Sequence, residues 1–192
     1  HRRFSFVLPF GFLLSGFALL VSYLGQMNPQ ITPLMPVLVS PWLSIHVSLI
    51  MMSYALLAFI MLNGILALCL RKKESENNVS GNDAIQDNRI EQLTLVSRLL
   101  LYPATFFLGA GIFLGAVWAN VSWGRYWAWD PKEVWALITF LVYGVAFHSQ
   151  SLRIFRKPLF FHIYMILAFL TVLMTYFGVN YVLGGMHSYA NA

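Results

Sequence analysis

Five segments of this chain are long and apolar enough to cross a lipid bilayer, and no other feature restricts its fold as strongly. A membrane-spanning helix needs about 20 predominantly apolar residues, and such segments lie at roughly 4–24, 46–70, 99–119, 134–150 and 159–182. Only 10% of the residues are charged, whereas soluble domains carry roughly 25%. The sequence therefore predicts an all-α integral membrane protein with about five transmembrane helices.

These segments divide the chain into four regions. The first transmembrane helix and an outer loop take up 1–45, and a second helix takes up 46–70. Residues 71–98 are polar, contain turn formers and lack an apolar period, which predicts a solvated cytoplasmic loop. The remaining region, 99–192, is expected to hold three transmembrane helices and an outer C-terminal tail.

Basic residues set the expected orientation. Ten of the twelve fall on one side of this topology, namely Arg2, Arg3, Arg71, Lys72, Lys73, Arg89, Arg98, Arg153, Arg156 and Lys157. Because cytoplasmic loops carry the excess of Lys and Arg, the opposite, outer face should hold the tryptophan-rich segment and the C-terminus. We expect a bacterial inner membrane, with thylakoid membranes as the alternative. The positive charge follows this topology and indicates no nucleic-acid partner.

Five of the six tryptophans lie within residues 118–135, between two apolar segments. Large aromatic faces are presented there at low conformational cost, and Gly124 permits a positive φ or a close backbone approach. Arg125 and Lys132 are candidate groups for binding carboxylates, with Arg125 the stronger because guanidinium binds in bidentate fashion. The pattern predicts a flat aromatic surface for a large, planar, amphipathic ligand. The alternatives are an interfacial aromatic belt and, for Lys132, a lipid headgroup contact.

The tetrapeptide Asp130-Pro131-Lys132-Glu133 predicts the start of a helix. Asp130 is a suitable N-cap and Pro131 fits the first helical position. Glu133, three residues after the cap, completes a capping box. Capping would fix the angle at which the tryptophan-rich segment meets the following helix.

Two histidines are expected at similar depth on the outer face. His46 lies at the start of the second apolar segment, and His187 lies just beyond the last one. Two neutral imidazoles can ligate a haem iron axially, although each residue also fits a simple interfacial anchor. His148 is expected at the cytoplasmic end of the fourth helix, where the helix dipole favours it. His162 and His1 are weaker candidates for ligands.

The segment Trp123–Asp130, followed by Pro131-Lys132-Glu133, resembles the WWD signature of membrane haem-handling proteins of cytochrome c maturation. The segments 175–180 and 185–190 resemble the CcsA/ResC branch, part of the System II cytochrome c synthase. The resemblance runs from about Trp42 to Ala190. It implies a haem b surface made of Trp118, Trp123, Gly124, Arg125, Trp127, Trp129 and Asp130.

The same resemblance implies roles for the histidines and for partners. His46 and His187 match the outer ligands of the haem iron, and His148 matches a residue of an inner haem site. The implied function is to present haem to the CxxCH segment of apocytochrome c, as a component of a synthase rather than a stand-alone catalyst. The implied partner is a CcsB/ResB-like membrane subunit, separate or fused upstream.

Two other functions stay open from the sequence. A haem exporter would move haem without attaching it, but Ser53 and Asn63 are too few to define a water-filled path. A b-type electron-transfer subunit would need paired histidines in the hydrophobic core, whereas His46 and His187 are peripheral.

Overall fold

The computed structural model describes residues 40–77, 83–148 and 151–183, together with positions 11, 12, 15, 16 and 19. Two units are distinct, 1–36 with residue 192, and 37–191. The described positions of the first unit are helical. The second unit contains every element discussed below, and its described residues contain helices and no strand.

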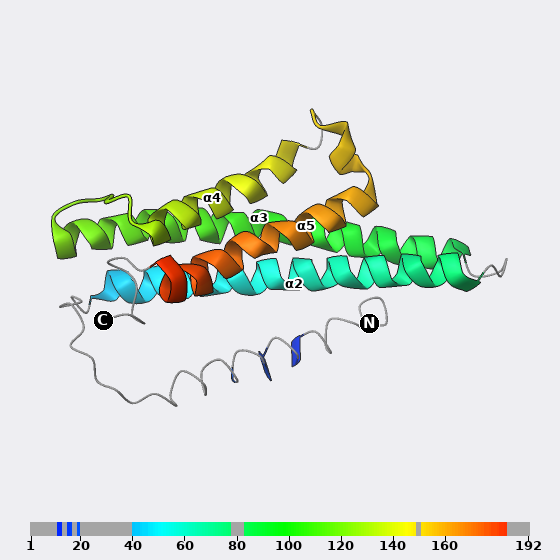
Figure 1. Cartoon of the computed structure of the whole chain (residues 1–192), viewed down its shortest axis with the longest axis horizontal. Coiled ribbons are helices and arrows are strands. Elements are labelled where there is room, and N and C mark those ends of the chain that lie inside the picture. Colours follow the sequence, from blue (N-terminus) through cyan, green and yellow to red (C-terminus); the bar gives the residue numbers. More distant parts are fainter. Residues whose placement is uncertain are drawn as a thin grey trace. The chain divides into compact units, whose positions relative to one another are not determined.

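Two long antiparallel helices form the base of the second unit. They are α2 (Pro41–Asn77) and α3 (Asp83–Trp123), which pack along their length (Figure 1). A second antiparallel pair lies across them, formed by α4 (Pro131–Val145) and α5 (Pro158–Leu173). The short turns η1 (Ala146–His148) and η2 (Arg153–Arg156) lie between α4 and α5, and the π-helical segment η3 (Met174–Leu183) continues α5.

Three of the described helices are long and apolar enough to cross a membrane: Pro41–Arg71, Asp87–Trp123 and Pro158–Leu183. Helix α4 has 15 residues, or roughly 22 Å at 1.5 Å per residue, which is shorter than a hydrocarbon core of about 30 Å. The expected first span, 4–24, lies mostly outside the described residues. An all-α integral membrane protein is thus confirmed, and the described residues contain three long spans together with the shorter α4.

The expectation of a loop over 71–98 is largely wrong, because most of this segment is helical. Helix α2 continues to Asn77 and α3 begins at Asp83, so 83–98 is helical throughout. Ile90, Leu93 and Ser97 follow each other at helical spacing, and Leu93 and Ser97 are buried at 2% and 0% exposure. The buried positions are few, include a serine and are interrupted by polar residues, so the sequence shows no clear apolar period.

The second helix also begins earlier than expected, at Pro41 rather than residue 46. Ser40 precedes it, and its Oγ accepts a hydrogen bond of 3.4 Å from the backbone N–H of Leu43. A serine before a proline at the first helical position is a favoured helix start. His46 therefore lies inside the helix, where the helical backbone limits the directions its ring can take.

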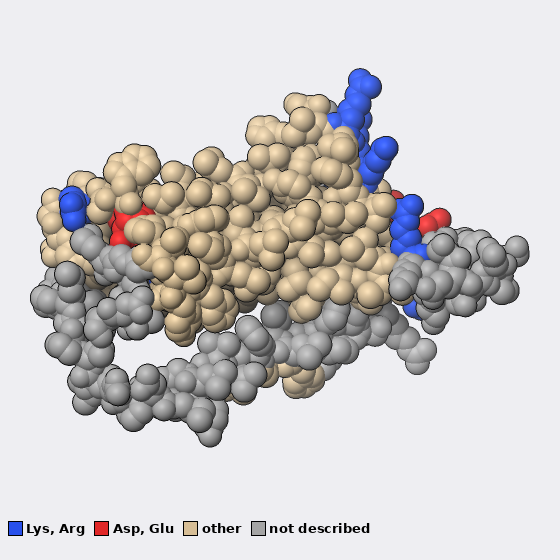
Figure 2. Space-filling view, in the orientation of Figure 1, with Lys and Arg blue, Asp and Glu red and all other residues tan. Residues whose placement is uncertain are grey.

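Charged side chains gather at the two ends of the second unit. The part of its surface uncovered in Figure 2 carries Lys and Arg at both ends and none between them. Arg125 and Lys132 belong to the end with the loop 124–130, and the basic residues of η2 belong to the other. This distribution agrees with a bundle whose flank lies in lipid.

Polar side chains connect the helices inside the bundle. Ser53 donates to the carbonyl of Ala104 at 2.8 Å, and Asn63 Nδ2 donates to Ser97 Oγ at 3.2 Å. Buried hydrogen bonds of this kind hold helices together in membranes, where the lipid supplies no hydrophobic force between them. Ser53 and Asn63 thus both help to pack α2 against α3.

Candidate functional site

His46 is fixed against α3 by its backbone. The Nδ1 atom lies 2.6 Å from the carbonyl oxygen of Gly111, and because a carbonyl only accepts, Nδ1 donates the hydrogen. A neutral imidazole with its proton on Nδ1 carries its lone pair on Nε2, the arrangement found in many metal-binding histidines. The structure therefore gives this half-buried ring the tautomer and the fixed orientation that an axial ligand needs.

The ring of His46 fits only because Gly115 has no side chain. A Cβ atom at that position would lie 2.6 Å from Cε1 of His46 and 2.7 Å from Nδ1. One turn earlier, a Cβ on Gly111 would lie 2.6 Å from Cδ1 of Ile50. The spacing Gly111-Ile-Phe-Leu-Gly115 is the small-xxx-small pattern that brings membrane helices close together. This pattern could have been found in the sequence, and it is the signal that sequence reasoning missed.

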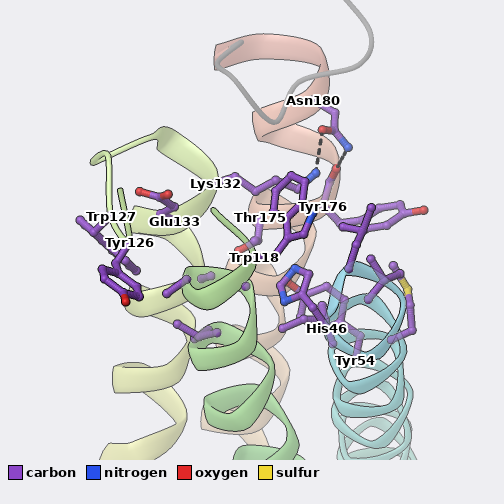
Figure 3. A pocket seen from close by; sticks show the side chains of 18 residues that line it. His46, Tyr54, Trp118, Tyr126, Trp127, Lys132, Glu133, Thr175, Tyr176 and Asn180 are labelled. Carbon is purple, nitrogen blue, oxygen red and sulfur yellow. Dashed lines mark hydrogen bonds between the residues drawn. The ribbon is translucent and has the colours of Figure 1, made fainter. Parts of the chain in front are cut away.

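His46 borders a partly open cavity of about 310 Å³ that is lined by α2, α3, α4, η3 and the loop 124–130 (Figure 3). Small-molecule sites usually measure about 300–1,000 Å³ and combine apolar walls with a few polar groups. The walls are mainly apolar and aromatic, and they comprise Leu43, His46, Val47, Ile50, Met51, Tyr54, Ile112, Gly115, Ala116, Trp118, Tyr126, Trp127, Lys132, Glu133, Ala136, Thr175, Tyr176 and Asn180.

The tryptophan-rich segment divides between this cavity and the surface. Trp118 and Trp127 belong to the wall, whereas Trp129 is 73% exposed. The rings of Trp118 and Trp123 meet edge to face at 71°, and those of Trp127 and Trp129 at 87°. The expectation of one flat aromatic surface is therefore wrong, because the ring planes within each pair are steeply inclined to each other. Edge-to-face packing of this kind is a favoured geometry for aromatic pairs.

The backbone of the loop explains this division. Gly124 has a φ of 72° and Trp129 a φ of 57°. A positive φ is rare for a residue with a side chain, and at Trp129 it turns the chain immediately before the helix start at Asp130. Arg125 is exposed and lies outside the cavity wall.

The predicted capping box is confirmed at the start of α4. Asp130 is the N-cap, its Oδ2 accepts from the backbone N–H of Lys132 at 3.2 Å, and Pro131 is the first helical residue. Oε2 of Glu133 accepts from the backbone N–H of Asp130 at 3.2 Å and from that of Ala128 at 2.8 Å. The second bond was not predicted, and it ties the loop to the helix. Glu133 thus holds one wall of the cavity in place.

Replacing Glu133 with alanine should therefore destabilise the protein. The change leaves two backbone N–H groups without their acceptor, and losing a cap of this kind costs about 0.5–2 kcal/mol in the free energy of unfolding. Thermal unfolding in detergent measures the loss. Glu133→Gln retains an acceptor oxygen and is the matched control, so equal destabilisation by both variants would contradict this explanation.

Lys132 extends from the first turn of α4 toward η3. Its Nζ donates to Oδ1 of Asn180 at 3.2 Å, and Asn180 Nδ2 donates to the carbonyl of Tyr176 at 2.7 Å. Burial lowers the pKa of the Lys132 ammonium below its usual range, and the Asp130 carboxylate opposes this shift. The cavity wall therefore carries an imidazole fixed by its Nδ1 and a half-buried amine.

The other histidines are distributed unevenly. His148 is exposed at the end of η1, between α4 and η2 and away from the His46 cavity. His162 is buried at 1% exposure. Thr94 Oγ1 donates to the carbonyl of Ile90 and lies 2.9 Å from Nε2 of His162, so Nε2 donates to Thr94. His187 lies outside the described residues.

The similarity to known sequences extends over nearly the whole chain. Residues 2–187 match the family described as Cytochrome C assembly protein. NrfI of Wolinella succinogenes is 40% identical over 189 residues, which cover 98% of this chain and 20% of NrfI. The cytochrome c biogenesis protein CcsA of Chlamydomonas reinhardtii is 38% identical over 187 residues, 96% of this chain and 50% of CcsA. CcsA of Guillardia theta is 36% identical over 182 residues, 86% of this chain and 60% of that protein.

Proposed function

The chain belongs to the cytochrome C assembly protein family, as a CcsA-type member, and we propose that it binds haem b at the outer face of the membrane and presents it to apocytochrome c. Attachment then takes place at a CxxCH segment of the apocytochrome. The chain spans between a fifth and three-fifths of the length of the relatives described above. We therefore assign it the haem-holding part of a larger synthase that includes a CcsB/ResB-like subunit, separate or fused.

The orientation of His46 is the observation that carries this proposal. Its Nδ1 donates to Gly111, so the neutral form of the ring carries its lone pair on Nε2, on the wall of a cavity that also holds Trp118 and Trp127. This donor set fits a haem, which needs a neutral imidazole for its iron and apolar or aromatic walls for its ring. An ordinary interfacial histidine needs neither the fixed tautomer nor the cavity.

A second axial ligand is proposed from the resemblance alone. His187 follows η3, whose residues Thr175, Tyr176 and Asn180 contribute to the cavity wall. Two imidazoles would keep the iron saturated until the apocytochrome's own histidine displaces one of them. The exposed Arg125 and Trp129, together with the half-buried Trp123, would then form the outer contact surface that meets the incoming protein, with Gly124 and Asp130 fixing its backbone.

The chemistry of attachment requires little from this chain beyond positioning. When haem is bound, its vinyl groups supply the double bonds to which cysteine thiols add, each forming one C–S bond and passing its hydrogen to the neighbouring carbon. No oxidant or reductant is consumed in that addition. Holding both reactants in place accounts for large rate gains. The residues of this chain thus bind, orient and shield the ring.

The proposed inner haem site is kept separate from this cavity. His148 would serve haem entering from the cytoplasm, together with a residue of the partner subunit. Its exposure at the end of α4 leaves its ring accessible to a second polypeptide. The basic residues at that end support a cytoplasmic position, and an outer position for the His46 cavity, in a bacterial inner membrane.

The exporter alternative differs in whether haem becomes covalently attached to the apocytochrome, and an assembly assay measures this. The full chain and its partner subunit are expressed with a reporter apocytochrome carrying CxxCH, in a host without its own maturation system. Haem that stays on the reporter after denaturing electrophoresis is expected. Haem that reaches the outer compartment without becoming attached would support export instead. Haem that remains bound and cycles between oxidation states, with no attachment, would support the electron-transfer alternative.

A further inference from the structure

The half-buried amine of Lys132 lies on the cavity wall, where the charge of a ligand would affect its binding affinity. Lys132 and Asn180 lie at one end of the cavity, with His46 beyond them (Figure 3). They come from α4 and η3, whereas His46 comes from α2. A guest in contact with both His46 and Lys132 therefore spans the cavity from α2 to the α4–η3 side.

The hydrogen bonds around Lys132 fix what it presents. Asn180 Nδ2 donates to the carbonyl of Tyr176, which leaves Oδ1 facing the ammonium of Lys132 at 3.2 Å. That bond uses one of the three ammonium donors and restrains the flexible lysine chain. The backbone carbonyl of Tyr176 thus orients the Asn180 side chain, which in turn holds the amine of Lys132 at the cavity wall.

The acidic residues nearest to Lys132 in sequence bind backbone N–H groups, although the Asp130 carboxylate also stabilises the ammonium of Lys132 electrostatically. Asp130 caps the helix through the N–H of Lys132 itself, and Glu133 accepts from the N–H groups of Ala128 and Asp130. A lysine in the first turn of a helix also lies at the positive end of the helix dipole, which disfavours a cation there. An anion arriving in the cavity would relieve that electrostatic cost and the cost of burial together.

We propose that Lys132, oriented by Asn180, binds the carboxylate of a ligand in this cavity. It would therefore select ligands that carry a carboxylate side chain as well as a metal to which the imidazole of His46 can bind. This inference rests on the proposed function and deepens it, because the two propionates of haem are such side chains. It also replaces Arg125 as the preferred propionate contact. Arg125 is exposed and lies outside the cavity wall, so its guanidinium belongs to the outer surface.

The test compares haem with its dimethyl ester, which has the same ring and iron but no free carboxylate. The purified full chain, with its partner subunit, is titrated with each compound, and binding is followed by the Soret band and by quenching of tryptophan fluorescence. Lys132→Met keeps the length of the side chain and removes its charge. Arg125→Met is the matched control, and Lys132→Arg restores a cation.

We expect the wild-type protein to prefer the free acid by about 10-fold, the equivalent of one charge-assisted contact. Lys132→Met should lose that preference by weakening the free acid alone, while Lys132→Arg and Arg125→Met should keep it. Asn180→Leu should reduce the preference as well. Affinity for the diester is the internal control, because a misfolded variant would lose both compounds equally.

Two results overturn the inference while leaving the proposed function intact: a preference that persists in Lys132→Met, or one that disappears in Arg125→Met. If Lys132→Met misfolds, Asn180→Leu becomes the deciding variant. An unchanged preference for the free acid in Asn180→Leu would then overturn the inference. A wild-type protein that binds neither compound would instead overturn the proposed function itself, and this inference with it.

Discussion

Replacing His46 with alanine is expected to abolish stable haem binding and, with it, the formation of c-type cytochromes. The variant loses the Nε2 lone pair as well as the bond from Nδ1 to Gly111. Disturbing only the residues that orient a metal ligand typically weakens binding by about 10–100-fold, and losing the ligand itself should cost at least as much. The visible spectrum of the detergent-purified protein measures the result. His187→Ala should behave in the same way under the proposal.

A matched control exists on the same helix. Ser48 is exposed and donates to the carbonyl of Ser44 within α2, outside the cavity wall, so Ser48→Ala should leave the spectrum unchanged. Added imidazole should partly restore haem binding to His46→Ala, because it can occupy the space that the side chain leaves. Wild-type cytochrome yield from both His46→Ala and His187→Ala would refute the ligand assignment.

The second large effect is expected from one methyl group on α3. In Gly115→Ala the new Cβ would lie 2.6–2.7 Å from two atoms of the His46 ring, so either the ring turns away or the helices separate. Overpacking of a closely packed site typically costs about 1–3 kcal/mol. Because the displaced ring would also lose its bond to Gly111, haem affinity should fall by about 10-fold or more.

Gly109→Ala separates this effect from a general loss of packing. Gly109 lies on the same helix, and a Cβ there would meet the ring of Phe140 on α4 at 3.0 Å, away from His46. Both variants should lose some thermal stability, but only Gly115→Ala should change the haem spectrum. An equal change in both spectra would show that haem binding depends on the helix contacts in general rather than on the seat of His46.

Local sequence signals predicted the helix start at Asp130 and the existence of the four apolar helices between Pro41 and Leu183, although not all of their ends. The capping box depends on four consecutive residues, and each of its hydrogen bonds lies within α4 or just before it. The error at 71–98 arose where local polarity and tertiary packing disagree. Leu93 and Ser97 become buried only because α2 is there to cover them, and that partner is distant in sequence.

The cavity depends on contacts that no local pattern contains. His46 meets Gly111 across 65 residues, and Lys132 meets Asn180 across 48 residues. The sequence indicated His46 through its position and the tryptophans through their density. It favoured Arg125 over Lys132 because side-chain chemistry alone ranks the guanidinium first. The proposed preference for Lys132 depends on the directions in which α4 and η3 present their residues, since Lys132 lines the cavity and Arg125 does not.

The hydrogen bonds between α2 and α3 also limit how a guest can enter. Ser53 and Asn63 hold the two helices at separate points along their length, and His46 holds them at a third. Sliding one helix past the other by a turn would break all three bonds at once, in surroundings where water is not there to replace them. The long pair is therefore a fixed wall. If the cavity binds haem as proposed, we expect the loop 124–130 and η3, rather than the α2–α3 pair, to move when the ring enters and leaves.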